Sequence, residues 1–280
     1  MTEPAIAEIA LSRLSAQGEL RAELESIHRL DWLDQGISRW LKLLDPQGPW
    51  PVVVLGARTP VGLAGTIVGV WAPQPIDRFD DLLESACPQP HHGSDRPAGG
   101  YWHFIAVTTD PRQRELALGR PLLAAALAFV RQQPMAQMRT LSPAVGLAEA
   151  LRTLELPGDL RDNCLRVLRS LARVDGGGHL PILGLHPASG ATLEKVLWNS
   201  RFDEKRSLGI TLRFTYDLSP SALESQKAAY RQWLAGRSAA IADGRALPAP
   251  LAQRWWVPDC GDLRILPALA GVNDGIIQRF

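Results

Sequence analysis

Cysteine and net charge of either sign are scarce in this sequence. The three cysteines, Cys87, Cys164 and Cys260, are an odd number without a Cys-x-x-Cys pair, which argues against a disulfide framework and a cysteine-built zinc site. The 30 Lys plus Arg residues nearly balance the 29 Asp plus Glu residues, and no basic block stands out, so nucleic acid is not expected as a partner. The paired His91 and His92 have no third ligand at suitable spacing, so we expect a solvated loop there and no metal site.

Long apolar runs are also missing from the start of the chain. The first twenty residues, MTEPAIAEIALSRLSAQGEL, have neither a basic beginning nor a continuous apolar stretch. A signal peptide needs a basic beginning, and both signal peptides and membrane anchors need a continuous apolar stretch. We therefore expect a cytoplasmic protein with no membrane partner.

The sequence divides into three parts. Its 280 residues, 46% hydrophobic and 21% charged, suffice for one or two globular domains. Residues 1–48 carry apolar positions at helical spacing, among them Ile6 and Ile9, which predicts a helical N-terminal preface. Residues 49–218 are expected to form the core. Residues 219–280 are expected to form a C-terminal helix and a Pro-rich tail packed on it.

Strand and helix patterns alternate irregularly along the core. Two β-branched runs, 51–55 and 63–71, predict a hairpin. Further along, the patterns predict strands at 101–107, 138–141 and 208–216 and helices at 116–130, 160–171 and 190–198. This order indicates an α+β fold rather than a regular doubly wound sheet.

The segment TTDPRQRELALGRPLL, residues 108–123, ends a strand and opens a helix. Backbone N–H groups at a helix start attract a phosphate, and Arg112, Arg114 and Arg120 add positive charge here. The segment resembles the acyl-CoA loop of GNAT-type acyltransferases, whose pattern falls on Arg114, Ala117 and Gly119. Ala117 replaces a glycine of that pattern, and the neighbouring Glu115 would repel a pyrophosphate.

Three later segments resemble malonyl-CoA decarboxylases in the same order. They are RTLSPAVG (139–146), HPASGA (186–191) and SLGITLRFTYD (207–217), and Trp198 stands where that family has Asn-Trp. The related GNAT-like loading domains of polyketide synthases share the same core. The resemblance covers residues 50–217 and implies a GNAT-like mixed sheet flanked by helices. Ser189 and Arg213 replace family asparagines, and 145–147 replaces Pro-Gly-Phe.

The resemblance implies that His186 and Ser142 are catalytic, with His186 taking the larger share, and Thr140 is the neighbouring hydroxyl to test. An imidazole with a pKa near neutrality could deliver a proton, and either group could stabilise an oxyanion. Alternatives remain for each, namely a core histidine at a strand end and a serine that caps a helix.

Three larger side chains are candidates for substrate binding. Arg201 could hold a carboxylate or phosphate, while Trp102 and Trp198 could line an apolar pocket. The alternatives are a surface arginine and two core tryptophans.

The function implied is decarboxylation of a malonyl or methylmalonyl thioester to the acetyl or propionyl thioester, as a starter-unit step in polyketide synthesis. Coenzyme A or the phosphopantetheine arm of an acyl carrier protein would carry the acyl group, and no other cofactor is required. The degenerate loop favours the carrier protein, because its arm has a single phosphate. The alternatives are acyl transfer from coenzyme A to a carrier-protein thiol or an amine, and a silent binding module.

Overall fold

The computed structural model shows the chain as two compact units, Met1–Leu141 and Ser142–Phe280. The residues that it describes are 4–9, 18–32, 44–45, 50–77, 99–148, 164, 181–197 and 207–242. The predicted domain limits at 48/49 and 218/219 stay predictions.

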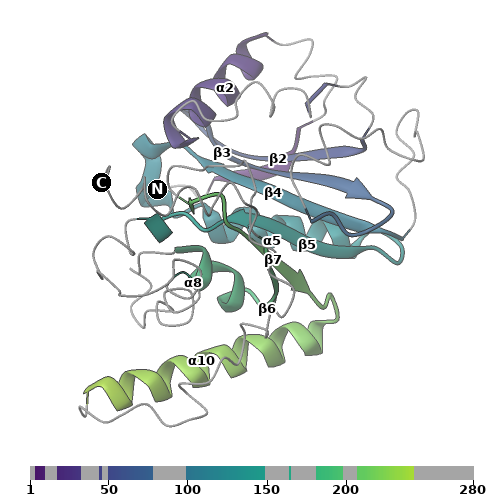
Figure 1. Cartoon of the computed structure of the whole chain (residues 1–280). Helices are drawn as coiled ribbons and strands as arrows, with labels where there is room; N and C mark the ends of the chain where they lie inside the picture. Colours follow the sequence, from purple (N-terminus) through teal and green to yellow (C-terminus); the bar gives the residue numbers. More distant parts are fainter. Residues whose placement is uncertain are drawn as a thin grey trace, which may run out of the picture. The chain divides into compact units, whose positions relative to one another are not determined.

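Unit 1 is built on a mixed sheet with the strand order β1-β2-β3-β4-β5 (Figure 1). β2 (Val52–Thr59) and β3 (Gly62–Ala72) form the expected hairpin, and β4 (Tyr101–Thr109) pairs antiparallel with β3. β5 (Gln137–Pro143) pairs with β4 in parallel, from Tyr101 and Gln137 to Phe104 and Thr140, and its end, from Ser142 on, belongs to unit 2. The strands predicted at 101–107 and 138–141 are therefore confirmed.

The N-terminal preface is only partly helical. Residues Ala5–Glu8 form strand β1, which pairs antiparallel with β2, so the predicted helix at Ile6 and Ile9 is wrong. Ile9 is buried, and its amide donates to the Val54 carbonyl at 2.8 Å. Pairing with the edge of the sheet thus outweighs the helical spacing. The described part of the preface does contain a helix, α2 (Gly18–Trp32).

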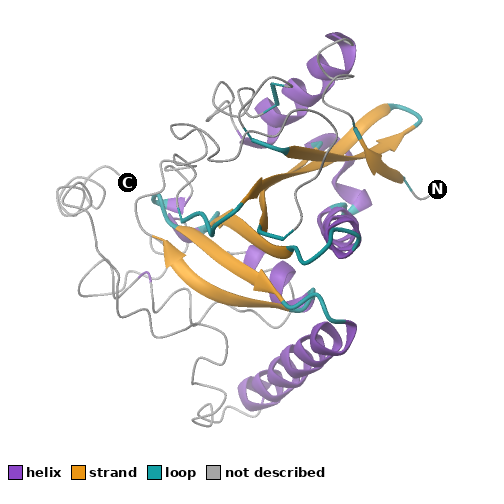
Figure 2. Ribbon diagram, turned by 90° about the vertical axis from the view of Figure 1, so that its right-hand side faces the viewer, coloured by secondary structure: helices purple, strands orange, loops and turns teal. Residues whose placement is uncertain are grey.

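Within the described residues of unit 1, helices α2 and α5 (Gly119–Arg131) pack against the sheet. α2 contacts β3 and β4 and buries Leu20, Leu24 and Ile27. α5 also contacts these strands, and it corresponds to the helix predicted at 116–130. A short 3₁₀ helix, η1 (Pro111–Leu116), precedes α5. Figure 2 shows the same sheet and helices from the side.

Unit 2 contains helix α8 (Pro181–Ala188), strands β6 (Ala191–Leu197) and β7 (Thr211–Tyr216), and helix α10 (Pro220–Ala242). The strands pair antiparallel, and α10 is the long helix at the bottom of Figure 2. α8 and α10 contact each other, and both contact β6. The strand expected at 208–216 is β7, which begins later, at Thr211, because the residues before it form a turn, and the expected C-terminal helix is confirmed.

The helix predicted at 190–198 is wrong, because Ala191–Leu197 is strand β6. Its side chains at Ala191, Leu193 and Val196 are buried, and a register shift after Leu193 moves the pattern by one residue. That shift gives the apolar positions a spacing of three, which imitates a helix. The helix predicted at 160–171 lies outside the described residues except for Cys164, which is buried.

Candidate active site

The HPASGA segment ends a helix and starts a strand. His186 lies in the last turn of α8, and the amides of Ser189 and Gly190 donate to the carbonyls of His186 and Pro187, each at 3.0 Å. Ser189, at a position where the decarboxylase motif that this segment resembles has asparagine, donates its hydroxyl to the Leu185 carbonyl at 2.8 Å. The expectation that His186 precedes a helix was therefore wrong, since it stands at a helix C-terminus.

Gly190 is required at this helix end for two reasons. Its φ of +91° is a left-handed conformation that side chains disfavour. A Cβ there would also lie 3.0 Å from the carbonyl oxygen of Leu223 in α10 and 2.9 Å from a methyl carbon of that residue. The backbone of α10 thus comes close to the end of the helix that carries His186.

His186 connects two hydroxyl groups through its two ring nitrogens. Nε2 lies 2.8 Å from Ser142 Oγ, and Nδ1 lies 2.7 Å from the hydroxyl oxygen of Tyr216. The imidazole also stacks on the ring of Phe214, with centroids 4.4 Å apart and an interplanar angle of 29°. Three elements, β5, α8 and β7, therefore supply one hydrogen-bonded series, which we call the Ser142–His186–Tyr216 series.

The segment Ser207–Asp217 positions the far end of this series. Leu208 and Gly209 have positive φ values of 55° and 69°, and the Ile210 amide donates to the Ser207 carbonyl at 3.0 Å. This turn sets where β7 begins. Because side chains alternate along a strand, Phe214 and Tyr216 point to the same face of β7 and meet His186 together.

Burial keeps the series uncharged. It lowers the pKa of His186 to about 3, because a desolvated imidazolium is disfavoured. It also raises the pKa of the Tyr216 hydroxyl well above 10. The expected near-neutral pKa of His186 was therefore wrong, and the imidazole is neutral at pH 7. Tyr216 was not among the predicted site residues, although it belongs to one of the segments that carry the resemblance.

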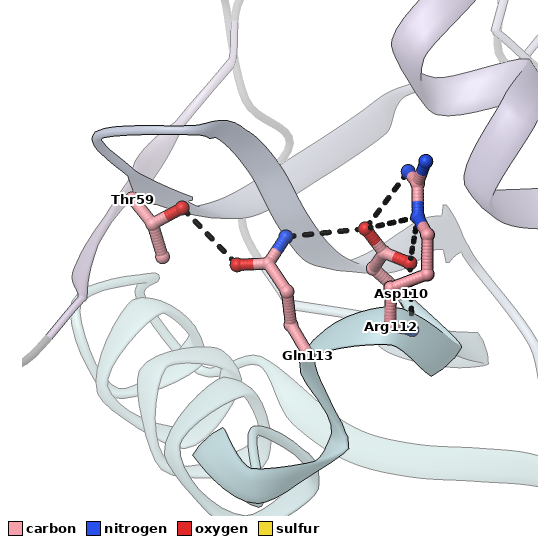
Figure 3. A network of polar contacts seen from close by, with 4 residues as sticks. All are labelled: Thr59, Asp110, Arg112 and Gln113. Carbon is pink, nitrogen blue, oxygen red and sulfur yellow. Dashed lines mark hydrogen bonds and ion pairs between the residues drawn. The ribbon is translucent and has the colours of Figure 1, made fainter.

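The residues predicted to bind a phosphate belong to the segment between β4 and α5. The carboxylate of Asp110, which is 2% exposed, accepts hydrogen bonds from the Arg112 amide and guanidinium and from the Gln113 side chain (Figure 3). The Gln113 amide oxygen in turn accepts from the Thr59 hydroxyl at 3.1 Å. The Arg112 hydrogen bond lowers the pKa of Asp110 to about 2.

This network gives Arg112 a partner within the chain, and its expected role in binding a phosphate stays a prediction. Arg112, Arg114 and Arg120 are all exposed, but the Arg112 guanidinium also contacts Asp110 at 2.9 Å. Ala117 has a φ of 47°, the left-handed conformation that the glycine of the family pattern would adopt easily, and Gly119 begins α5. Asp110 and Gln113 were missed by the sequence reasoning, although an Asp-Pro pair ahead of a helix is a common capping signal.

The other predicted residues lie in different surroundings. Thr140, on β5, is 2% exposed, and its Oγ1 has no hydrogen-bond partner within the described part of the chain. Trp102 is 1% exposed and packs edge-on against Phe129 of α5, with ring centroids 5.0 Å apart. Arg201 and Trp198 lie outside the described residues. The roles assigned to these four residues stay predictions.

Arg213 stands where the decarboxylase family has asparagine. Its side chain is 3% exposed, and Nη2 lies 3.0 Å from Glu194 Oε1 on the neighbouring strand. Burial lowers the pKa of its guanidinium. By strand alternation Arg213 points away from the face of β7 that carries Phe214 and Tyr216. The substitution therefore adds no cation to the Ser142–His186–Tyr216 series.

Several solved structures share this architecture. The malonyl-CoA decarboxylase from Cupriavidus metallidurans matches with a TM-score of 0.58 and 18% identity, covering 82% of this chain and 64% of that chain. The malonyl-CoA decarboxylase from Agrobacterium vitis matches with a TM-score of 0.58 and 14% identity, covering 90% and 68%. The GNAT-like decarboxylase GphF, solved with isobutyryl-CoA, matches with a TM-score of 0.54 and 18% identity, covering 77% and 100%. The chain has a GNAT-like α+β fold.

The similarity confirms the predicted fold class, and the neighbours are the proteins that the motifs resembled. At sequence identities of 14% to 18%, the similarity shows a shared fold and does not show a shared substrate. The chain spans 64% of the length of the Cupriavidus metallidurans enzyme. No protein-family model and no curated protein sequence matches the chain. Among the helices that the structure describes, none is both long and apolar enough to cross a bilayer.

Proposed function

We propose that this protein decarboxylates a malonyl- or methylmalonyl-type thioester and so supplies an acetyl or propionyl starter unit for polyketide synthesis. The observation that carries the proposal is the Ser142–His186–Tyr216 series. It joins a hydroxyl and an imidazole from two segments that separately resemble the decarboxylase family. The GNAT-like fold, shared with malonyl-CoA decarboxylases, supports the same class of reaction.

The reaction needs a donor at one oxygen atom. Loss of CO2 breaks the bond between the α-carbon and the carboxylate carbon, and the electron pair moves into a thioester enolate. The negative charge lies largely on the thioester oxygen, so a fixed donor beside that oxygen lowers the barrier. A proton must then be added to the α-carbon to give the product thioester. None of these steps requires a protein nucleophile.

Ser142 is the member of the series that a substrate can reach, because it is half-buried while His186 and Tyr216 are buried. We assign its hydroxyl to the thioester oxygen and assign His186 to holding that hydroxyl in place. His186 is neutral at pH 7, and the Tyr216 hydroxyl is a weaker acid than usual. The proton that reaches the α-carbon therefore comes from water rather than from an imidazolium.

The thioester carrier is proposed to lie at the segment between β4 and α5. Arg112, Arg114 and Arg120 are all exposed there, but Asp110 already pairs with the Arg112 guanidinium, and the exposed Glu115 adds negative charge. Such a loop suits one phosphate better than a pyrophosphate. This favours the phosphopantetheine arm of an acyl carrier protein over coenzyme A, so an acyl carrier protein is the proposed partner.

Mass spectrometry of the acyl group tests this function. The protein is incubated with malonyl and methylmalonyl thioesters, each on coenzyme A and on a carrier protein. We expect loss of CO2, faster on the carrier protein, and a strong decrease in Ser142→Ala and His186→Gln variants. Folded protein that leaves all four substrates intact would contradict decarboxylation. Equal turnover on both carriers would remove only the carrier preference.

The same experiment separates the alternative of acyl transfer, which the shared GNAT-like fold also supports. Transfer of labelled acetyl groups from acetyl-CoA to a carrier protein or an amine, without CO2 release from malonyl substrates, would favour a transferase. Undiminished activity of the His186→Gln variant in either assay would remove the His186-centred mechanism.

A further inference from the structure

The Ser142–His186–Tyr216 series can carry its protons in two directions. A neutral imidazole has one N–H, so one ring nitrogen donates and the other accepts. If Nδ1 carried the proton, it would donate to the Tyr216 oxygen, and Nε2 would accept from Ser142. If Nε2 carried the proton, Tyr216 would donate to Nδ1, and Nε2 would donate to Ser142. The first direction would activate Ser142 as a nucleophile, and the second would not.

The surroundings of Tyr216 distinguish the two directions. Its side chain is buried, and within the described part of the chain the atom that contacts its hydroxyl is His186 Nδ1, at 2.7 Å. In the first direction the phenol hydrogen would be buried without that acceptor, which is unfavourable for a hydroxyl in an apolar setting. In the second direction the phenol hydrogen of Tyr216 is donated to His186 Nδ1. Phe214, stacked on the ring, offers no competing polar atom.

The other end of the series agrees with this choice. With Nε2 as donor, the Ser142 oxygen accepts at 2.8 Å and its own hydrogen is left to point elsewhere. Ser142 is half-buried, so that hydrogen can reach a bound ligand. Hydrogen bonds that run in one direction strengthen one another, so Tyr216 and His186 make the Ser142 hydroxyl a better donor.

From this geometry we infer that Tyr216 is a positioning residue that fixes His186 as the Nε2–H tautomer and thereby makes Ser142 a hydrogen-bond donor to the substrate rather than a nucleophile. The inference rests on the proposed function for its catalytic consequence, but the tautomer is a property of the protein without substrate. It implies that turnover proceeds without an acyl-serine intermediate. An acyl-thioester without a carboxylate group, such as acetyl-CoA, should therefore not acylate Ser142.

Nitrogen-15 NMR of the histidine side chains tests the tautomer directly. The full chain is labelled with ¹⁵N-histidine at pH 7, and the His186→Gln variant assigns its signals among the six histidines. We expect a protonated Nε2 and an unprotonated Nδ1. A protonated Nδ1 in the wild-type protein would overturn the inference, whatever the activity.

The Tyr216→Phe variant tests the cause. It removes the donor to Nδ1, so we expect the Nδ1–H form to appear in the spectrum and kcat to fall about tenfold or more with little change in KM. Tyr230→Phe is the matched control, because Tyr230 is a buried tyrosine of α10 outside the series. It should change neither the spectrum nor kcat. A Tyr216→Phe spectrum identical to the wild type would overturn the role of Tyr216.

The fate of Ser142 gives a further readout that does not depend on decarboxylation. Wild-type protein incubated with acetyl-CoA should show no added acetyl mass in a peptide that contains Ser142. An acetylated Ser142 in the wild type would overturn the inference. If the tautomer is as stated but malonyl thioesters are left intact, the proposed function fails and the assignment of the series stands.

Discussion

Acidification should destabilise unit 2 through His186. In the unfolded chain a histidine has a pKa near 6.5, while burial lowers the pKa of folded His186 to about 3. Between these pH values the unfolded state binds more protons than the folded state. The contribution of neutral His186 to the unfolding free energy is therefore fully present above pH 6.5 and is lost as the pH falls toward 3. At pH 5, which is about 1.5 units below the pKa of the unfolded histidine, the loss of unfolding free energy is about 2 kcal/mol at 1.36 kcal/mol per unit.

Urea denaturation at pH 7 and pH 5 measures this loss. The wild type should lose about 2 kcal/mol more unfolding free energy between the two pH values than the His186→Gln variant, in which the group cannot titrate. His103 provides the equivalent test in unit 1. Burial also lowers its pKa to about 3, and its Nε2 accepts from the Ile76 amide at 3.2 Å. Equal pH dependence in the wild type and the His186→Gln variant would refute the claim that folded His186 is neutral at pH 5.

Three further predictions concern other parts of the molecule. Gly190→Ala should lower the unfolding free energy by more than about 1 kcal/mol, because the new Cβ would contact Leu223 and residue 190 has a positive φ. Thermal or urea denaturation measures this loss. An unchanged midpoint would contradict the close approach of α10 to residue 190. Arg114→Gln should raise KM for the thioester a few-fold, more at low salt than at high salt, whereas Arg112→Gln should have a smaller effect because Asp110 already holds that guanidinium. The pH profile of kcat/KM should show no step near pH 6.5 from His186, and such a step, absent in the His186→Gln variant, would contradict the lowered pKa.

Regular burial patterns explain why much of the fold could be predicted. The runs that became β2, β3 and β4 are rich in β-branched and aromatic residues and lie between turn signals, so local sequence and final structure agree. The failures occurred where pairing between strands decides the outcome. β1 is a strand because β2 offers an open edge, and β6 is a strand because it pairs with β7. The residues of β1 and β6 alone do not show that these segments pair with β2 and β7.

The candidate site was predictable in its residue types but not in its connections. His186 and Ser142 stood out because each belongs to a short recognisable segment. The contact between His186 and Tyr216 spans thirty positions and depends on where β7 begins. Similarly, the contact of Arg112 with the buried carboxylate of Asp110 depends on a local turn that the pattern of arginines does not reveal, and the phosphate-binding role of Arg112 stays a prediction. A sequence motif identifies which side chains can take part in a site, whereas their charge state depends on how deeply the fold buries them.

The close approach of Gly190 to α10 bears on how this protein can be divided. The C-terminal helix supplies the backbone against which the end of α8 rests, and Leu223 lies only a few residues after its start. A fragment that stops at residue 218 would expose the turn that holds His186 to water. Trimming the chain to the part that resembles the decarboxylases would therefore remove a support of the candidate site, and α10 is best kept in any shortened form of the protein.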